Sequence, residues 1–302
     1  DKLNNGTKLD INEEFFEKWK EAGMSDRLAY HFAALFVHDC IVIFSERTEY
    51  DELSTEHFEN LNSTNWNSVS FKPPPSLDSN IGWRVEFRTL DVQITDYENA
   101  AYIALVNLMT RVLNDFDVNL SLPITLSDIN MQRAHQRDAV TNQKFWFRRN
   151  IIKKDTDFTE NKIKKNGWIS EGFDASEEEN KESEFVEMTI YDILKGNEEI
   201  GNTGLFELIK KYMDLNKFSE DDKYYYNSML DLLLKRASGE VKTGAKFMRD
   251  IVLNHPNYEH DSIVNNRIWY DLVKETTLLG IPSKWDESLL GEKPKFMEEY
   301  LK

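Results

Sequence analysis

Apolar side chains recur at helical spacing in the first part of the chain. Between Asn12 and Phe44 this spacing predicts two helices, with Ser25 as the N-cap of the second. The residues expected in the core of this pair are Leu28, Phe32, Leu35 and Phe36. Consecutive prolines at 73–75 cannot form helix, so we expect a rigid, extended connector there.

Strict alternation of apolar and charged residues predicts a strand over residues 82–90. Because successive side chains of a strand point to opposite faces, the two kinds of residue separate onto two faces. The apolar face would carry Trp83, Val85 and Phe87, and the charged face Arg84, Glu86 and Arg88.

Helical patterns dominate the rest of the chain. Thr95 to Glu98 has the form of a capping box, and the apolar run 100–113 predicts a helix buried on most sides and packed against the preceding strand. Two later stripes consist of Leu205, Leu208, Ile209, Tyr212 and Met213, and of Val241, Ala245, Met248, Ile251 and Val252. Between these regions, residues 152–184 are rich in Lys, Glu, Asp and Asn, and we interpret them as a mobile surface insertion.

Composition narrows the class of protein. The chain has 302 residues, 40% of them hydrophobic, which is enough for a substantial core. A formal charge of −17 argues against a general nucleic-acid or anionic-membrane surface. No apolar run approaches the roughly 20 residues of a membrane helix, and the first ten residues lack signal-peptide features. We therefore expect a soluble, cytoplasmic protein.

The cysteine, the histidines, the glycine-rich segment and the basic residues provide no strong candidate for a catalytic, metal-binding or anion-binding site. The single cysteine, Cys40, excludes an internal disulfide, and its apolar neighbours favour a small buried hydrophobe over a reactive thiol. His31 and His38 lie two helical turns apart, too far for adjacent metal ligands. The segment from Gly196 to Gly204 lacks the ending of a phosphate-binding loop. A basic cluster is more typical of a solvated helical face than of an anion site: Arg133, Arg137, Lys144, Arg148 and Arg149.

The charged strand face is the strongest candidate site. Glu86 could ligate a hard divalent metal, and Arg84 and Arg88 could hold carboxylate or phosphate groups through forked hydrogen bonds. The alternative is a solvated sheet face whose charges pair with one another, and spacing alone favours it. Nearby, Trp66 and Lys72 could form an aromatic wall and a phosphate-facing ammonium, although a tryptophan beside prolines is more often packed structure.

Several stretches together resemble the catalytic subunit of eukaryotic glutamate–cysteine ligase. They occur in order, at compatible spacing, and cover most of the chain. The first group is His57-Phe58-Glu59-Asn60, Ser63-Thr64-Asn65-Trp66, Phe71-Lys72-Pro73-Pro74-Pro75 and Ile81-Gly82-Trp83-Arg84-Val85-Glu86-Phe87-Arg88. The second group is Val92-Gln93-Ile94-Thr95-Asp96-Tyr97-Glu98-Asn99, Gln136-Arg137-Asp138-Ala139-Val140, Lys235-Arg236-Ala237-Ser238-Gly239-Glu240 and Asn254-His255-Pro256-Asn257-Tyr258.

This resemblance implies a reaction. Members of the family join the γ-carboxyl of L-glutamate to L-cysteine with ATP and Mg²⁺ through a γ-glutamyl phosphate, the first step of glutathione biosynthesis. Glu86 would then be a Mg²⁺ ligand, and Arg88 would bind the glutamyl or transferring phosphoryl oxygens as the catalytic arginine. Arg84 would be a third member of this group, and Lys72 and Trp66 would contact the nucleotide. Glutathione would act as feedback inhibitor, and a regulatory subunit is a further candidate partner.

The resemblance also implies a fold and an incomplete site. We expect an α+β chain with part of a curved antiparallel sheet, like that of glutamine synthetase and guanido kinases. Residues 1–150 would supply strands, packing helices and part of the active site, 151–187 the insertion, and 188–302 a helical layer. We expect one C-terminal portion of the enzyme, inactive alone because the N-terminal active-site segments are missing. The alternative is a noncatalytic binding or scaffolding fragment.

One segment departs from the family pattern. Where the family has Arg-Asp-Pro, this chain has His38-Asp39-Cys40, so the role of that arginine and proline is in doubt here.

Overall fold

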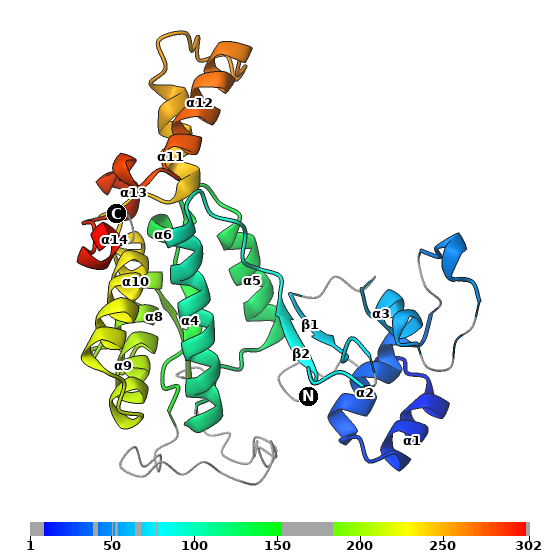
Figure 1. The fold of residues 1–302 in the computed structure, drawn as a ribbon. Helices are drawn as coiled ribbons and strands as arrows, with labels where there is room; N and C mark the ends of the chain where they lie inside the picture. The colour runs from blue at the N-terminus through cyan, green and yellow to red at the C-terminus, as the bar shows by residue number, and fades with distance from the viewer. Residues whose placement is uncertain are drawn as a thin grey trace. The chain divides into compact units, whose positions relative to one another are not determined.

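A computed structural model describes residues 9–38, 42–49, 51, 54–63, 68–76, 78–116, 118–152 and 184–299. Contacts group the chain into two compact units, Gly6–Asp91 and a larger one that begins at Val92. We call them the N-terminal and C-terminal units (Figure 1). The sequence showed no linker at this boundary, and the expectation of a single folding unit stays a prediction.

The N-terminal unit contains the two helices that the hydrophobic spacing predicted. Helix α1 spans Glu13–Glu21 and α2 spans Asp26–Leu35, with Ser25 at the N-cap position as expected. They are followed by the 3₁₀ turn η1 (Ser45–Arg47) and α3 (Glu56–Ser63). Of the predicted core residues, Phe32 and Leu35 are buried. The prediction for Cys40 lies outside the described residues.

An antiparallel hairpin completes this unit. Strand β1 (Val69–Lys72) pairs with β2 (Arg84–Phe87), and the proline run lies in their connection. Aromatic rings join the hairpin to the helices: Phe71 stacks on Trp83 at 5.1 Å, and Phe32 lies 5.9 Å from the same indole. These contacts cover the apolar face incompletely, because Trp83 remains 48% exposed and Val85 and Phe87 are exposed as well. The apolar face of β2 is therefore largely exposed among the described residues.

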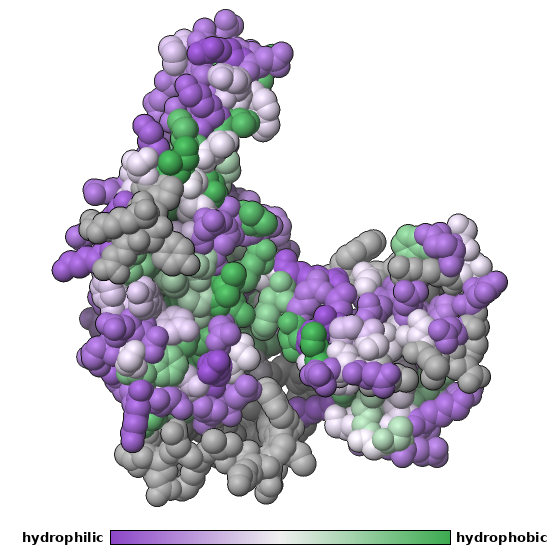
Figure 2. All heavy atoms as spheres, in the orientation of Figure 1, coloured by the Kyte–Doolittle hydropathy of each residue, from purple (hydrophilic) through white to green (hydrophobic). Residues whose placement is uncertain are grey.

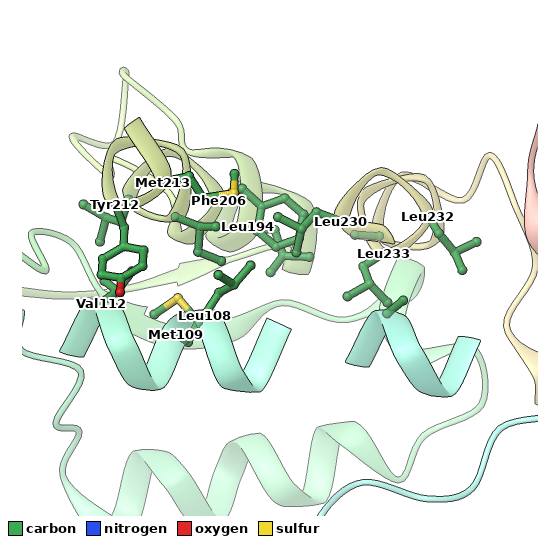
Figure 3. Packing of buried hydrophobic residues seen from close by; sticks show 14 of the residues in the cluster. Leu108, Met109, Val112, Leu194, Phe206, Tyr212, Met213, Leu230, Leu232 and Leu233 are labelled. Atoms are coloured by element: carbon green, nitrogen blue, oxygen red, sulfur yellow. The ribbon is translucent and has the colours of Figure 1, made fainter. Parts of the chain in front are cut away.

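Helices form the core of the C-terminal unit. Helix α4 (Asp96–Asp115) packs against α10 (Glu220–Ser238) and α9 (Leu205–Leu215), while α8 (Ile190–Lys195) contacts α9 and α10. Figure 3 shows side chains from these helices facing one another in one apolar layer. The predicted stripe on α9 is confirmed at Leu208, Ile209, Tyr212 and Met213. Helix α4 is less enclosed than predicted, since Ile103 is 65% exposed.

A second strand pair borders the predicted insertion. Between α4 and this pair lie α5 (Ile124–Ala134) and α6 (Ala139–Asn142). Strand β3 (Phe145–Arg148) pairs antiparallel with β4 (Phe185–Met188), and Ile152 bridges to Val118. The insertion was predicted over 151–187, so both of its ends instead belong to the folded unit. Its mobility is a prediction that lies outside the described residues, which omit 153–183.

A helical hairpin and three short elements end the chain. Helices α11 (Gly244–Leu253) and α12 (Asn266–Leu278) contact each other and project from the helical body (Figure 1). After them come η3 (Pro282–Lys284), α13 (Glu287–Leu290) and α14 (Lys295–Glu299). The predicted stripe is confirmed at Val241, which is buried, and at Ile251, which packs against the core, but not at Met248, which is exposed. The buried residue of α11 is Phe247, which the stripe did not include. Figure 2 shows hydrophobic side chains among hydrophilic ones on this hairpin. None of the described helices has the length and apolarity needed to cross a membrane.

Candidate functional site

The candidate site is the polar face of the β1–β2 hairpin. In the antiparallel register Ser70 lies opposite Glu86 and Lys72 lies opposite Arg84. Side chains directly opposite on an antiparallel pair share a face, so Ser70 and Lys72 join the charged face predicted from β2 alone. Strand β1 was not predicted from the sequence. The alternation Val69-Ser70-Phe71-Lys72 is the signal that could have shown it.

Glu86 lies between two cations. One carboxylate oxygen accepts a hydrogen bond from Arg88 Nε at 2.9 Å, and the other lies 3.3 Å from Lys72 Nζ. The hydrogen bond from Arg88 is the main reason that the pKa of the Glu86 carboxyl lies below its usual range, and Lys72 lowers it further. Both cations favour the charged form of the carboxyl. The Glu86 side chain is 41% exposed, so water screens these ion pairs. The trio is a solvent-accessible charged group with one more positive than negative charge.

The second predicted arginine, Arg84, has a different partner. Arg84 donates a hydrogen bond from Nη2 to the carbonyl oxygen of Pro73 at 2.8 Å. This bond ties the start of β2 to the proline connector and leaves the rest of the guanidinium on the polar face. The structure thus brings Lys72, Glu86 and Arg88 into direct contact and places Arg84 at the end of the same face. Trp66 lies outside the described residues, and its nucleotide role stays a prediction.

The strand face has two interpretations, a binding site for anions and a metal ion or a solvated face whose charges pair with one another, and the observed ion pairs bear on both. Internal pairing between Glu86 and its neighbours is what the solvated-face alternative expects. The geometry is also compatible with anion binding, because a bidentate guanidinium can bind an oxyanion while it retains one carboxylate contact. The hairpin places the Arg88 guanidinium on this face, in contact with Glu86 through its Nε.

The residues of this face do not make a magnesium site by themselves. Mg²⁺ requires near-octahedral oxygen ligands, and both Glu86 oxygens already face cations at 2.9 and 3.3 Å. Nowhere in the described ranges do three or more His, Cys, Asp or Glu side chains gather in a way that could hold a metal ion. Glu86 could therefore serve as one ligand only if Lys72 moved away and other oxygen groups joined it.

The basic cluster of the C-terminal unit has structural partners. Arg133 contacts Glu187 at 2.6 Å and donates to the carbonyl of Lys144 at 2.7 Å, which fastens α5 to the β3–β4 pair. Arg148 is buried, pairs with Glu184 and donates to the carbonyl of Ser121 at 2.9 Å. These contacts explain Arg133 and Arg148 as charged residues packed around a small sheet.

Two of the histidines, His31 and His255, make packing or hydrogen-bond contacts within the fold. His31 lies beside Phe32 with ring centroids 5.4 Å apart, and partial desolvation of its ring lowers its pKa. His255 accepts the backbone N–H of Asn257 at Nδ1 (3.1 Å), and its Nε2 lies 3.2 Å from Asp271. With Nδ1 occupied by a backbone donor, His255 is fixed as a link between the end of α11 and α12.

Comparison with known proteins gives one consistent result. The family model described as glutamate-cysteine ligase matches residues 1–279. Among curated relatives, glutamate–cysteine ligase of Dictyostelium discoideum is 36% identical over 97% of this chain and 43% of its own length. The enzyme of Schizosaccharomyces pombe is 37% identical over 93% of the chain and 39% of its own length. The catalytic subunit from Mus musculus is 37% identical over 89% of the chain and 41% of its own length.

The match confirms the resemblance deduced from the sequence motifs. The chain spans about 40% of the length of these relatives, and the hairpin with Lys72, Glu86 and Arg88 lies within the matched region. The chain belongs to the glutamate–cysteine ligase family.

Proposed function

We propose that this chain forms part of an ATP- and Mg²⁺-dependent ligase that joins the γ-carboxyl of L-glutamate to L-cysteine through a γ-glutamyl phosphate. Family membership and the charged hairpin face support this proposal. Because the chain spans about 40% of its relatives, the activity is proposed for a protein that also contains a counterpart of their remaining sequence. The product would enter glutathione biosynthesis, in the cytoplasm.

The single observation that carries the proposal is the Lys72–Glu86–Arg88 contact on one exposed strand face. Transfer of a phosphoryl group spreads negative charge over equatorial oxygens, and preoriented cations lower the free energy of that state. Glu86 contacts the Arg88 guanidinium at its Nε and orients it on this face, and Arg88 would donate to the glutamyl or phosphoryl oxygens. Arg88 would be the catalytic residue, and Arg84 would bind substrate oxygens beside it.

Lys72 would serve the nucleotide. Its ammonium sits on the same face as the arginines, opposite Arg84 in the register, and would approach the ATP phosphates as a point charge. For Glu86 to ligate Mg²⁺, the 3.3 Å contact with Lys72 would have to open. Mg²⁺ would supply charge neutralisation and orientation of the phosphates. Other oxygen ligands would come from segments beyond the described residues.

Wider expectations accompany this function. We propose the partial curved sheet of the glutamine synthetase and guanido kinase type as the fold, with the β1–β2 pair as part of it. L-glutamate, L-cysteine and ATP would be the substrates, and glutathione the feedback inhibitor. The relative from mouse is named a catalytic subunit, and on that basis we include a regulatory subunit among the proposed partners.

The test combines binding and turnover. Isothermal titration would measure binding of Mg²⁺-ADP and of a γ-glutamyl phosphate mimic, by this chain alone and by the longer protein. The longer protein would also be assayed for ligation as the parent and as Glu86→Gln and Arg88→Ala. We expect Arg88→Ala to lower kcat by about 100-fold or more, the size found on removal of one preorganised donor to a developing anion.

A matched control separates this site from general ion-pair loss. Glu14→Gln removes the carboxylate of another exposed ion pair, Glu14–Lys18 at 2.6 Å on α1, and should leave binding and turnover unchanged. Equal rates for Glu86→Gln, Arg88→Ala and the control would overturn the assignment of this face. In that case the noncatalytic scaffold would be the better interpretation.

A further inference from the structure

A buried asparagine reaches the β1–β2 hairpin from helix α3. Asn62 lies in the last turn of α3 and is only 1% exposed. Its side-chain Nδ2 donates to the carbonyl oxygen of Phe71 at 2.5 Å and lies 3.4 Å from the hydroxyl of Ser70. Both partners belong to β1, so one side chain links the end of α3 to the strand that carries Lys72.

Asn62 uses its donor and leaves its acceptor unused. The carbonyl oxygen of Phe71 can only accept a hydrogen bond, so it must face the Nδ2 group. The other polar atom, Oδ1, is buried and has no hydrogen-bond partner among the described residues. A buried acceptor without a partner costs free energy, and an apolar side chain would fill the same space without that cost. What distinguishes Asn62 at this position is therefore the amide donor.

The carbonyl that Asn62 holds lies on the outer edge of β1. In an antiparallel ladder, every second residue bonds to the partner strand, and the backbone groups of the residues between them point outward. The carbonyl of Ser68 accepts from Arg88 at 2.8 Å, so in this register residues 70 and 72 also bond toward β2. Phe71 lies between these positions, and its carbonyl faces the outer edge, where Asn62 meets it.

This carbonyl belongs to the same peptide group as the N–H of Lys72. A peptide group is planar, so the carbonyl of Phe71 and the N–H of Lys72 point in opposite directions from one rigid unit. The N–H faces β2, and Asn62 holds the carbonyl. Among the described residues no further strand pairs with this edge of β1. The peptide from which the Lys72 side chain extends is thus held from both sides, by β2 and by Asn62.

The Lys72 side chain is oriented from this peptide. It is only 23% exposed, and its Nζ lies 3.3 Å from Glu86 on the polar face of the hairpin. A binding group must be held within about 0.5 Å of its working position by supporting residues that are themselves fixed. Asn62 is buried and bonded one residue away, and it can give Lys72 this support.

We propose that Asn62 is a positioning residue for the contact between Lys72 and the ATP phosphates. This role rests on the proposed nucleotide contact of Lys72 and adds to it a residue that touches neither ATP nor the reacting atoms. Asn62 acts through the Phe71–Lys72 peptide. It fixes the rotation of β1 about its own axis, and with it the direction in which the ammonium group extends from the strand. Without the amide, the outer edge of β1 is free to rotate.

Ligation kinetics of the longer protein test this role. We expect Asn62→Ala to raise KM for ATP by about three- to tenfold, the factor that one net hydrogen bond contributes, with kcat changed by less than about twofold. Because Asn62 acts through Lys72, Asn62→Ala should raise KM little further in a Lys72→Gln background. A residue that only stabilised the fold would have the same effect in both backgrounds.

Hydrogen exchange of this chain tests the positioning without any ligase activity. In Asn62→Ala the amide of Lys72 should exchange faster by about tenfold, while the amide of Arg88, at the other end of the ladder, keeps its rate. Asn60→Ala is the matched control. Asn60 lies on the same helix and donates its Nδ2 to the carbonyl of Val42 at 2.8 Å, which belongs to neither strand. This variant should change neither the exchange of Lys72 nor KM for ATP.

Failure of the positioning role and failure of the proposed function give different results. If Lys72→Gln raises KM for ATP but Asn62→Ala behaves like Asn60→Ala, the positioning role is wrong and the role of Lys72 stands. If Lys72→Gln leaves KM unchanged, the nucleotide contact of Lys72 is wrong, and the positioning role fails with it. Unchanged exchange of the Lys72 amide in Asn62→Ala would also overturn the positioning role, because Asn62 would then not hold this peptide.

Discussion

The buried pair of Glu98 and Arg236 provides the sharpest test of the C-terminal unit. Glu98 is fully buried and accepts hydrogen bonds from the backbone N–H and the hydroxyl of Thr95, at 2.9 and 2.8 Å, and from Arg236. Glu98→Ala removes the capping box of α4, worth about 1 kcal/mol, and leaves a buried guanidinium without its countercharge. Breaking a buried pair from one side costs about 3–5 kcal/mol. We therefore expect about 4 kcal/mol of lost stability, a large share of the ~5–15 kcal/mol typical of a whole protein.

The second half of this test replaces both partners. Buried ion pairs exchanged for apolar residues of similar volume are often neutral in stability, because desolvation of the charges offsets their attraction. Glu98→Leu/Arg236→Met should therefore lie within about 1–2 kcal/mol of the parent, while each single change costs several times more. The remaining deficit comes from the lost capping box and from the hydrogen bonds that Arg236 makes to Gln93 and to the Leu289 carbonyl.

Native-state hydrogen exchange is the appropriate assay, because it reports the opening free energy of α4 and α10 separately from the N-terminal unit. Asp231→Ala is the matched control: it breaks the exposed Asp231–Lys235 pair on α10 and should change this free energy by less than about 0.5 kcal/mol. A loss below about 1 kcal/mol for Glu98→Ala, or a double variant less stable than either single one, would refute the reasoning.

Two further predictions concern backbone strain and pH. Gly204 has φ +81°, and an added Cβ would lie within 2.5 Å of backbone atoms of Lys195 and Gly196, whereas at Gly201, with φ +80°, the nearest neighbour of an added Cβ is 3.9 Å away. Gly204→Ala should therefore lower the free energy of unfolding, measured in urea, clearly more than Gly201→Ala does. Equal effects would contradict the close approach at Gly204. The pKa of the Glu86 carboxyl is lowered in the folded chain, so its stabilising contribution is present above its unfolded pKa and is lost as the pH falls through the folded pKa. A ¹³C titration of this carboxyl should show the pKa rising toward its normal value in Arg88→Gln. If the pKa does not rise, Arg88 is not the cause of the shift.

Local sequence patterns predicted the structural elements that depend only on residues close together in the chain. The two N-terminal helices with Ser25 as N-cap position, the capping box of Thr95 and Glu98, and the strand around Glu86 were all predicted from periodicity. Each is specified by residues a few positions apart, where backbone geometry fixes which side chains meet. The family was also recognisable from the order and spacing of short motifs.

Only the tertiary structure decided which charged groups meet. Lys72 reaches Glu86 because antiparallel pairing sets β1 beside β2, and Glu98 meets Arg236 across 138 positions of sequence. Exposure of the apolar face of β2 and of Ile103 depends in the same way on what packs against them, which a single-strand or single-helix pattern does not contain. The sequence by itself determined the elements and the family. Long-range packing determined the register and the burial, because these depend on contacts between residues far apart in the chain.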